Sequence, residues 1–478
     1  MPASADLIVL GAGPAGLAAA WRAGLAGLSA IVVERAPAVG GMAASFDVAG
    51  VRVDHGSHRL HPATPPAVLA DLRGLLGEDL QCRPRNGRLR ISGPEDGSQW
   101  VGFPLRPAEL LRALPAGMLA RIATEALTKP LRGGQRPTSY AAALRAGLGP
   151  TLYDALYAPY AVKLWGLPGS QIDAEQARRR VSADTPWKIA RRMLRRGSGQ
   201  GRVFYYPRRG FGQIVEALAA AAVDAGAQLR LGTEASRVHP AADGVTVHTR
   251  DGQTLTAGHL FTTIPLPLLA RIVAPAVPTS AVDAAAALRF RSMVLVYLVH
   301  EGRPWTGFDA HYLPGLDTPV SRISEPANYR DSATDPDDRT VLCCEVPCQF
   351  GDQWWSADEG SLAAMIAETL DRAGLPPVRC LDVVARRLRT VYPVYETGYT
   401  EHLRGLDSWA SQLPRITTFG RLGLFVHDNT HHAIAMAYAA VDALTHGHLT
   451  HGHRADGHWD ATAWSAARRR FADHIVED

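Results

Sequence analysis

The stretch Leu7-Ile-Val-Leu-Gly-Ala-Gly-Pro-Ala-Gly16 decides the fold of this chain. Its first four residues are a continuous apolar run, which is typical of a buried parallel strand. Gly11, Gly13 and Gly16 follow in the spacing G-x-G-x-x-G. In that spacing the first glycine permits a tight turn, the second lets a pyrophosphate approach the backbone, and the third lets a helix pack close to the strand. The stretch therefore predicts a dinucleotide-binding βαβ unit.

The residues after Gly16 complete this unit. An Ala- and Leu-rich helix is expected to run to about Gly27, and the residues from Ala30 form a second strand that ends at Glu34. An acid at this place, about 20 residues after the glycines, fits the residue that binds the ribose hydroxyls. A parallel unit without a dinucleotide is the weaker alternative, because strand, glycines, helix, strand and acid all stand in register.

The composition is that of an ordinary globular protein. The chain has 478 residues, of which 46% are hydrophobic and 20% charged, and its net charge is +4. This length predicts two or three domains, and the small net charge argues against a nucleic-acid partner. No apolar run is long enough for a membrane span. The five cysteines are too few for a disulfide scaffold, which favours a reducing compartment and a cytoplasmic location.

The residues after Glu34 narrow the dinucleotide. The segment Glu34-Arg-Ala-Pro-Ala-Val-Gly40-Gly41-Met42 resembles the second half of the FAD fingerprint in glutathione-reductase-like flavoproteins. Within that group, the chain resembles the branch of amine oxidases, protoporphyrinogen oxidases and UDP-galactopyranose mutases. Met42 departs from the pattern, because an Arg is frequent at its place. The resemblance implies FAD as the cofactor and an α/β, Rossmann-like FAD-binding domain of the glutathione-reductase type.

Four further segments carry the resemblance along the chain. They are the "D-x-G-x-H" stretch at 53–59, the "Y-x-x-K-x-W-G" stretch at 157–166, the "Y-P-x-x-G-x-G-Q" stretch at 206–213, and the segment at 420–429. The resemblance implies that the first passes close to the flavin ring and that the last two return the chain to the FAD domain.

The chain is expected to leave the FAD domain twice and to return twice. Residues 105–200 have helical periodicity, whereas 292–300 and 340–347 alternate like strands. Short strands are expected at 229–231, 245–249 and 259–263, and helices at 213–226 and 431–445. We therefore expect a discontinuous FAD-binding domain from 1–90, 205–275 and 405–478, a mainly helical domain from 91–204, and a mixed-sheet substrate-binding domain from 276–404.

The resemblance also implies which residues bind FAD. Those at the nucleotide and pyrophosphate are Gly11, Gly13, Pro14, Ala15, Gly16, Glu34, Arg35, Gly40, Gly41, Met42, Ala235 and Thr263. Those nearer the flavin are Gly56, Ser57, His58, Arg59, Gly420, Arg421, Asn429, His432, Ala433 and Ile434.

Three residues are candidates for the reaction itself. A flavin accepts a hydride at N5, and negative charge then grows near N1, where a helix N-terminus at Asn429 would stabilise it. His58 is a candidate base at the flavin edge. Tyr395 would orient a substrate, with packing as the alternative. His427 stands where the mutases carry a Tyr that serves the diphosphate.

Three reactions are compatible with the sequence. The preferred one is an FAD-dependent oxidoreductase that removes a hydride from a small biosynthetic metabolite, at a C–H next to N, O or an activated carbon. A redox-neutral, mutase-like isomerase acting on a nucleotide sugar through reduced flavin is second, because His427 and Asp184 replace two residues that serve the mutases' diphosphate. A carotenoid-type desaturase at a membrane surface is third.

Residues 178–209 are rich in Arg and contain a single acid, Asp184. They would form a solvated face, bind an anionic or sugar-linked small-molecule substrate, or contact a membrane through residues 187–196. No dedicated metal site is expected: the histidines of the tail at 446–453 come without the carboxylates or the spaced Cys and His pairs of such a site, so a solvated loop is the better interpretation.

Overall fold

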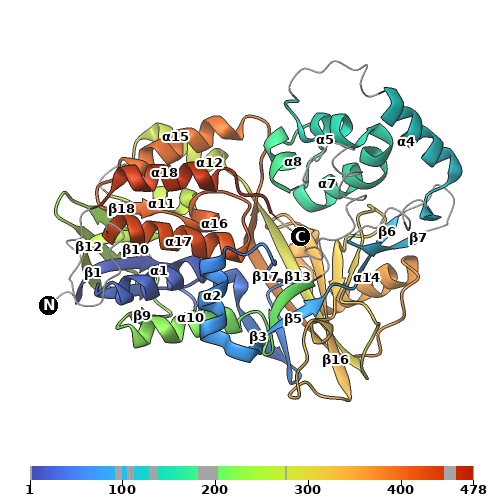
Figure 1. Cartoon of the computed structure of the whole chain (residues 1–478), viewed down its shortest axis with the longest axis horizontal. Helices are drawn as coiled ribbons and strands as arrows, with labels where there is room; N and C mark the ends of the chain where they lie inside the picture. Colours follow the sequence, from blue (N-terminus) through green and yellow to red (C-terminus); the bar gives the residue numbers. More distant parts are fainter. Residues whose placement is uncertain are drawn as a thin grey trace.

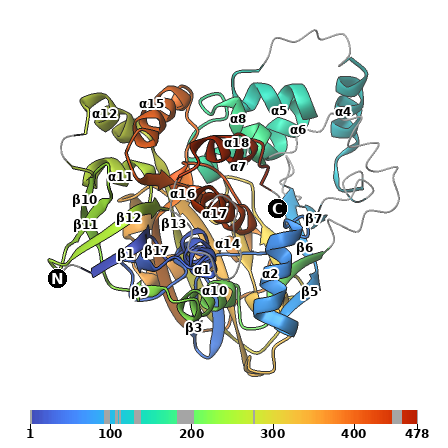
Figure 2. The ribbon, with the colours of Figure 1, turned by 60° about the vertical axis from the view of Figure 1, so that its left-hand side comes forward.

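The computed structural model describes residues 3–91, 99–104, 109, 112–128, 137–180, 203–274, 277–445 and 459–476. Figure 1 shows a large α/β part on the left, a second sheet at the lower right and a helical part above that sheet. The C-terminal end of the chain lies in the middle of the molecule in Figures 1 and 2. None of the helices in the described ranges is long and apolar enough to cross a membrane.

The first sheet is built around the glycine-loop strand. Its order is β10-β11-β12-β1-β2-β9, and β18 also pairs with β12. The pairs that β1 makes with β12 and β2 are parallel, as are β2 with β9 and β12 with β18, whereas β10, β11 and β12 are antiparallel. The bounds are β1 Ala3–Leu10, β2 Ala30–Val33, β9 Gln228–Arg230, β10 Ala235–Pro240, β11 Val245–Thr249, β12 Thr254–Thr262 and β18 Ile416–Thr418.

Helices cover both faces of this sheet, which explains why its central strand is a continuous apolar run. Leu7 and Val9 point into a core with α1, α10 and α17, whereas Ile8 and Leu10 point into a core with α11, α12 and α15. Figure 2 shows α1 beside α17 and, on the other side of the sheet, α12 beside α15. The bounds are α1 Pro14–Leu25, α10 Gln213–Asp224, α17 Thr430–Thr445, α11 Leu266–Ile272, α12 Thr279–Ala287 and α15 Tyr399–Ser411; α2 Pro66–Leu76, α16 Gly420–Gly423 and α18 Ala461–Phe471 also belong to this part.

The second sheet has the order β17-β13-β16-β15-β14-β6-β7. Helix α14 covers one face, and the hairpin β3–β4 covers the other. The bounds are β17 Cys380–Pro393, β13 Phe290–Glu301, β16 Arg339–Cys348, β15 Arg322–Ser324, β14 Ala310–Tyr312, β6 Gly87–Ile91, β7 Gln99–Phe103, α14 Glu359–Arg372, β3 Ser45–Val48 and β4 Val51–Asp54.

The helical part packs its own small core. Its bounds are α4 Ala116–Thr128, α5 Tyr140–Leu148, α6 Pro150–Leu152, the π-turn η4 Tyr153–Tyr157, α7 Ala158–Trp165 and α8 Ala174–Arg180. The remaining elements are η1 Gly41–Ala43, η2 Gly77–Asp79, β5 Leu80–Pro84, β8 Val203–Pro207, η6 Pro326–Tyr329 and α13 Gln353–Ser356.

The predicted α/β architecture is confirmed, and the expected strands and helices are present within one or two residues, except that β1 begins earlier, at Ala3, and β12 at Thr254. The structure differs from the expected domain boundaries in three places. Helix α12, expected in the domain of 276–404, and the whole of α15, expected to be divided at residue 405, pack on the first sheet. Strand β6 spans the boundary expected at residue 90, β7 follows it, and both join the second sheet through the β6–β14 pair. The chain therefore contributes to the second sheet before it enters the helices. The predicted contact helix at 187–196 and the His-rich tail at 446–453 lie outside the described residues.

Candidate functional site

The glycine loop at the end of β1 leaves one side of the backbone open. Gly11 has a φ of 104°, a left-handed conformation that favours glycine, and Gly13 precedes the first turn of α1 at Pro14. A Cβ on Gly16 would lie 1.9 Å from the carbonyl oxygen of Gly11, so α1 packs directly on the loop. A Cβ on Gly13 would meet no atom closer than 3.9 Å. The helix N-terminus at Gly13 is therefore not covered by the chain itself, and its N–H groups suit a phosphate.

Gly40 and Gly41 lie against this loop. The Gly40 N–H donates to the Ala12 carbonyl at 2.7 Å, and a Cβ on Gly41 would lie 3.7 Å from the Cα of Gly13. Met42, at the place where an Arg was expected, packs into the core between the second sheet and the β3–β4 hairpin. The glycine loop and the Gly40–Gly41 pair thus lie together and form one cradle. Position 42 contributes no cationic side chain to it.

Glu34 stands at the other end of the cradle. Its carboxylate accepts the N–H groups of Ala12 and Ala36, both at 2.9 Å. Its carbonyl accepts the Thr233 N–H at 2.9 Å, which places Ala235 and the start of β10 nearby. This arrangement suits the ribose and adenine end of a dinucleotide. Arg35, by contrast, is exposed.

The segment at Gly420 closes the cradle from the C-terminal side. Gly420 has a φ of 80°, and a Cβ there would lie 3.2 Å from the Cβ of Ala15 and 3.6 Å from that of Thr263. The Thr263 hydroxyl donates to the Leu10 carbonyl at 3.0 Å. The sites predicted from three separate stretches of sequence therefore meet at the end of β1.

Gly56 and Ser57 join the FAD domain to the second sheet. The Ser57 N–H donates to Oε1 of Glu345 at 2.9 Å, and its hydroxyl hydrogen-bonds the hydroxyl of Tyr329. Gly56 has a φ of 95°, and a Cβ there would lie 3.3 Å from the same Glu345 oxygen. A glycine is therefore needed for both the conformation and the close approach of Glu345.

Arg59 extends this connection. Its guanidinium donates to the Tyr312 hydroxyl at 3.1 Å and pairs with Asp309 at 3.2 Å. The charge of Arg59 is thus already balanced by a carboxylate of the chain. The contacts of Arg59 therefore support a role in shaping the loop at residues 56–59.

His58 is held as a neutral imidazole. Its ring packs edge-on against Phe211 with 5.3 Å between centroids, and its buried Nδ1 has no hydrogen-bond partner within the described ranges. Burial, helped by the positive charge of Arg322, lowers the pKa of His58 to about 3. An imidazole with so low a pKa would be a poor acceptor for a substrate proton, so these contacts do not support the predicted role of His58 as a base.

A second polar cluster surrounds Tyr392, at the end of β17. The guanidinium carbons of Arg180 and Arg421 lie 4.9 and 5.1 Å from the centre of its ring. The Nε atoms of both arginines are buried without a hydrogen-bond partner in the described structure, where neither arginine forms an ion pair. Arg421 does donate to the carbonyls of Val391 and Asp428. Two positive charges from different parts of the fold thus converge on one aromatic ring.

His427 belongs to the same cluster. It is fully buried, and its ring packs edge-on against Trp165 at 5.1 Å and Tyr395 at 4.8 Å. Burial, followed by the charge of Arg180, lowers the pKa of His427 well below its usual value. This imidazole is therefore neutral and packed rather than a free cation for a diphosphate.

Tyr395 has a packing role. It stacks on Tyr399 with 4.2 Å between ring centroids, and its hydroxyl donates to the Phe425 carbonyl at 3.2 Å. The residue is 2% exposed. The expected contact between the Tyr395 hydroxyl and a substrate is therefore replaced by a bond to the backbone, which is the packing alternative.

The start of α17 packs tightly on α1. Ala433 and Ile434 are buried in the shared core, which brings the first turn of α17 beside the glycine-loop helix. The side chain of His432 accepts the Asn429 N–H at 3.2 Å and turns toward Asp428. Ala433 and Ile434 thus offer backbone groups at the site.

Several residues of the site were not predicted as cofactor or catalytic residues. Glu345 is a lone acid in the apolar strand β16, a signal that could have revealed it. Tyr392, Arg180 and Arg322 make side-chain contacts that depend on the tertiary fold. Tyr312 and Tyr329 carry no sequence signal.

The described residues fit FAD. The open backbone at Gly13 and the carboxylate of Glu34 suit the dinucleotide, and the orphaned Nδ1 of His58 and Nε of Arg421 are polar atoms that a flavin or a substrate could satisfy. These groups lie partly on the cradle and partly on the connection to the second sheet. A cofactor that extends from one to the other would contact both sets.

Comparison with known sequences agrees with FAD as the cofactor. The sequence pattern of the flavin-containing amine oxidoreductases matches residues 14–420. Among curated proteins no sequence matches this chain.

Three solved structures illustrate the likeness of fold. A reduced UDP-galactopyranose mutase is 20% identical with a TM-score of 0.80, and the match covers 99% of this chain and 100% of the other. A protein named as a protoporphyrinogen oxidase from Exiguobacterium sp. 255-15 is 19% identical with a TM-score of 0.70, over 91% and 97% of the chains. A putrescine oxidase bound to putrescine is 18% identical with a TM-score of 0.62, over 91% and 98%. At these identities the likeness establishes the fold.

Proposed function

Because this chain belongs to the family of flavin-containing amine oxidoreductases, it is an FAD-dependent enzyme, and we propose that it oxidises a small metabolite that carries an anionic group. The bond cleaved is a C–H next to nitrogen, oxygen or an activated carbon. Bound FAD supplies the acceptor for the hydride.

The charges around Tyr392 carry the proposal for the substrate class. Arg180 and Arg421 place two guanidinium groups within about 5 Å of this ring, and neither meets a carboxylate in the described structure. A protonated amine would be repelled there, whereas a carboxylate or phosphate would satisfy the orphaned Nε–H groups. An anionic substrate is therefore favoured over a free polyamine.

The chain's own residues contribute positioning more than proton transfer. His58 and His427 are both held neutral by burial, so neither is a strong base. The loop at Gly56 is fixed by Glu345 and Tyr329, which keeps this wall of the site rigid. We propose that the substrate reacts in a form that needs no strong protein base, and that orientation supplies most of the rate.

Anaerobic mixing tests the reaction. Candidate carboxylate- or phosphate-bearing substrates are added to the oxidised holoenzyme, and the visible flavin absorbance is followed. Bleaching in a single turnover supports the oxidoreductase, and the same anionic substrates giving no bleaching while putrescine does would refute the substrate class.

Arg180→Met and Arg421→Met sharpen this test. Losing one charged hydrogen bond of about 1.5–3 kcal/mol should raise KM roughly 10- to 100-fold, with a smaller effect at high salt. Arg145→Met is the control, because Arg145 is an exposed arginine paired with Asp154. An unchanged KM in both site variants would contradict the assignment.

A mutase-like isomerisation is the second candidate. Paired guanidinium groups also suit the diphosphate of a nucleotide sugar, and this observation favours it. This isomerisation would be supported if the enzyme converts a nucleotide sugar only after chemical reduction of the flavin, and without net oxidation of the substrate. The membrane-surface desaturase depends on residues 187–196, which lie outside the described residues.

A further inference from the structure

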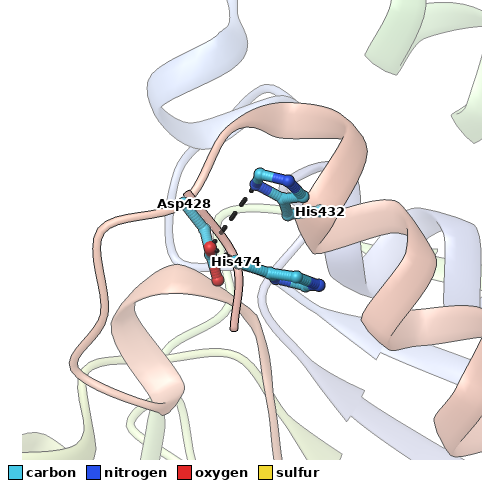
Figure 3. A group of neighbouring side chains, drawn as sticks. All are labelled: Asp428, His432 and His474. Carbon is cyan, nitrogen blue, oxygen red and sulfur yellow. Dashed lines mark ion pairs between the residues drawn. The ribbon is translucent and has the colours of Figure 1, made fainter. Parts of the chain in front are cut away.

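Asp428, His432 and His474 come together from two distant stretches of the chain. Asp428 lies between α16 and α17, His432 stands in the first turn of α17, and His474 follows α18 near the end of the chain. Figure 3 shows the three side chains beside one another, and the rings of His432 and His474 are stacked with 4.2 Å between centroids. One ligand atom from each lies within 4.8 Å of the others.

Two of the separations, both from Asp428, match the edge length of a tetrahedral metal site. Oδ1 of Asp428 lies 3.4 Å from Nδ1 of His432 and 3.3 Å from Nδ1 of His474. Four ligands at about 2.0–2.1 Å from a zinc ion lie about 3.3–3.4 Å apart along a tetrahedral edge. The same separations are long for direct hydrogen bonds, whose usual range is about 2.7–3.2 Å.

The hydrogen-bond pattern leaves lone pairs facing each other. Because Nδ1 of His432 accepts the Asn429 N–H at 3.2 Å, it carries a lone pair and no proton. Both oxygens of Asp428 are buried, and in the described part of the chain His474 at 3.3 Å gives this carboxylate only a long, weak hydrogen bond. Arg421 reaches only the Asp428 carbonyl. A buried carboxylate beside a lone pair is unfavourable unless a cation lies between them.

We propose that Asp428, His432 and His474 bind a divalent transition-metal ion, with Zn²⁺ the best match, and that water completes its coordination. Two imidazoles and a carboxylate are a ligand set that Zn²⁺ accepts readily. The metal would take the lone pair of His432 in place of the 3.2 Å contact with the Asn429 N–H.

The metal would fix the C-terminal segment between two parts of the fold. The Val476 N–H donates to the Arg179 carbonyl at 2.8 Å, and Arg178 donates to the Ala472 carbonyl at 2.8 Å. The segment at 472–476 therefore already touches α8 of the helical part, while His474 touches the start of α17. A metal at His474 would tie the helical part to the helix that meets the cofactor.

Metal binding by the full-length holoenzyme tests this proposal. The protein is stripped with a chelator, Zn²⁺ is titrated, and bound metal is measured by elemental analysis and calorimetry. The histidines at 446, 448, 451 and 453 are replaced by Ala in every protein tested, so that they cannot supply the signal. One equivalent of Zn²⁺ is expected, and less than about a tenth of an equivalent would overturn the proposal.

Ligand variants locate the metal. Asp428→Asn and His474→Gln should each weaken binding by about 100-fold or more, since even partners beyond the ligands change affinity 10- to 100-fold. His402→Gln, an exposed histidine of α15, is the matched control. Unchanged binding in His474→Gln would overturn the assignment. Because His474 lies in the last residues of the chain, this variant should keep its FAD content and provide a folded comparison.

Two further readouts distinguish a tetrahedral site from loose binding. Co²⁺ should give the intense visible bands of a tetrahedral ion in the parent protein and lose them in His474→Gln. Hydrogen exchange at 472–476 should slow when Zn²⁺ is added, and only in the proteins that keep all three ligands. If hydrogen exchange at 472–476 does not change when Zn²⁺ is added, the metal does not fix this segment.

Discussion

Three glycines of one loop have different neighbours, so an added side chain has a different consequence at each. At Gly16 a Cβ would meet the Gly11 carbonyl oxygen at 1.9 Å, and at Gly11 it would meet the Thr263 hydroxyl at 2.4 Å. At Gly13 nothing of the chain lies closer than 3.9 Å. Gly11 and Gly16 are therefore required by the fold, whereas we expect Gly13 to be required by the ligand.

This difference predicts two separate phenotypes. Gly16→Ala should lose soluble, folded protein, because backbone atoms cannot move away cheaply. Gly13→Val should fold and yet contain almost no FAD, because the side chain occupies the place of the pyrophosphate. Circular dichroism and the flavin released on denaturation measure the two effects. Gly74→Val, at an open position in α2, is the control, and a flavin-replete Gly13→Val protein would show that the cofactor lies elsewhere.

At this scale the sequence predicted the glycines and Glu34 because their roles are set by local spacing. It could not predict the chemistry of His58 or Tyr395. The low pKa of His58 arises first from burial and then from the charge of Arg322, which lies far along the chain, and the Tyr395 hydroxyl donates to the Phe425 carbonyl. Such properties arise only when distant residues are packed together.

The buried amine of Lys163 connects helix α7 to the second sheet. Nζ of Lys163 donates to the carbonyls of Leu313 at 2.6 Å and Val320 at 2.9 Å, in the connection between β14 and β15. Burial lowers the pKa of Lys163 to about 7. The family motif contains this lysine, and its geometry gives it a structural role.

Lys163→Met should therefore destabilise the protein without removing FAD. Two buried carbonyls would lose their donor, at a cost of about 2–4 kcal/mol in the free energy of unfolding. Denaturant unfolding checks the magnitude. Arg145→Met removes an exposed ion pair instead and should change stability by less than about 1 kcal/mol. A Lys163→Met protein as stable as the parent would exclude this anchoring role.

Most elements could be predicted from apolar periodicity, since β1, β13 and β16 are buried on both faces and α1 has a regular Ala and Leu pattern. Strands β6 and β7 could not be assigned to their sheet. Their partner β14 lies more than two hundred residues later, and pairing of that kind leaves no trace in local sequence.

Across the whole molecule, buried neutral histidines make stability depend on pH. Burial lowers the pKa of His259 and His311 to about 3 each. Nδ1 of His311 accepts a hydrogen bond from Arg88 at 2.8 Å, which a protonated ring could not do. In the unfolded chain both groups titrate near about 6.5. The stability they contribute is present above that pH and is lost as the pH falls toward 3.

The melting temperature should accordingly drop as the pH is lowered from 7 to 5. Each histidine should contribute about 1.4 kcal/mol per pH unit below about pH 6. In His311→Gln the slope of the unfolding free energy against pH should decrease by the contribution of one bound proton, about 1.4 kcal/mol per pH unit. Scanning calorimetry with excess FAD measures it, and exposed His402→Gln should keep the parent slope. An identical slope in His311→Gln would mean that His311 is protonated in the folded protein.

The meeting of His474 with Asp428 and His432 also belongs to this scale. Histidine and aspartate spacing along the chain gave no metal motif, because the third residue arrives only when α18 folds back on α17. Clusters assembled by the whole fold are invisible to local patterns.

The pairing of β1 with β12 has a consequence for synthesis of the protein. Residues 3–10 leave the ribosome long before the strand that covers one of their edges, which spans residues 254–262. At about 5–20 residues per second, this edge waits on the order of 10–50 seconds for its partner. A nascent chain of this protein thus carries an apolar strand with one unpaired edge until residue 262 has been made, and this is the interval in which a chaperone would matter most to its yield.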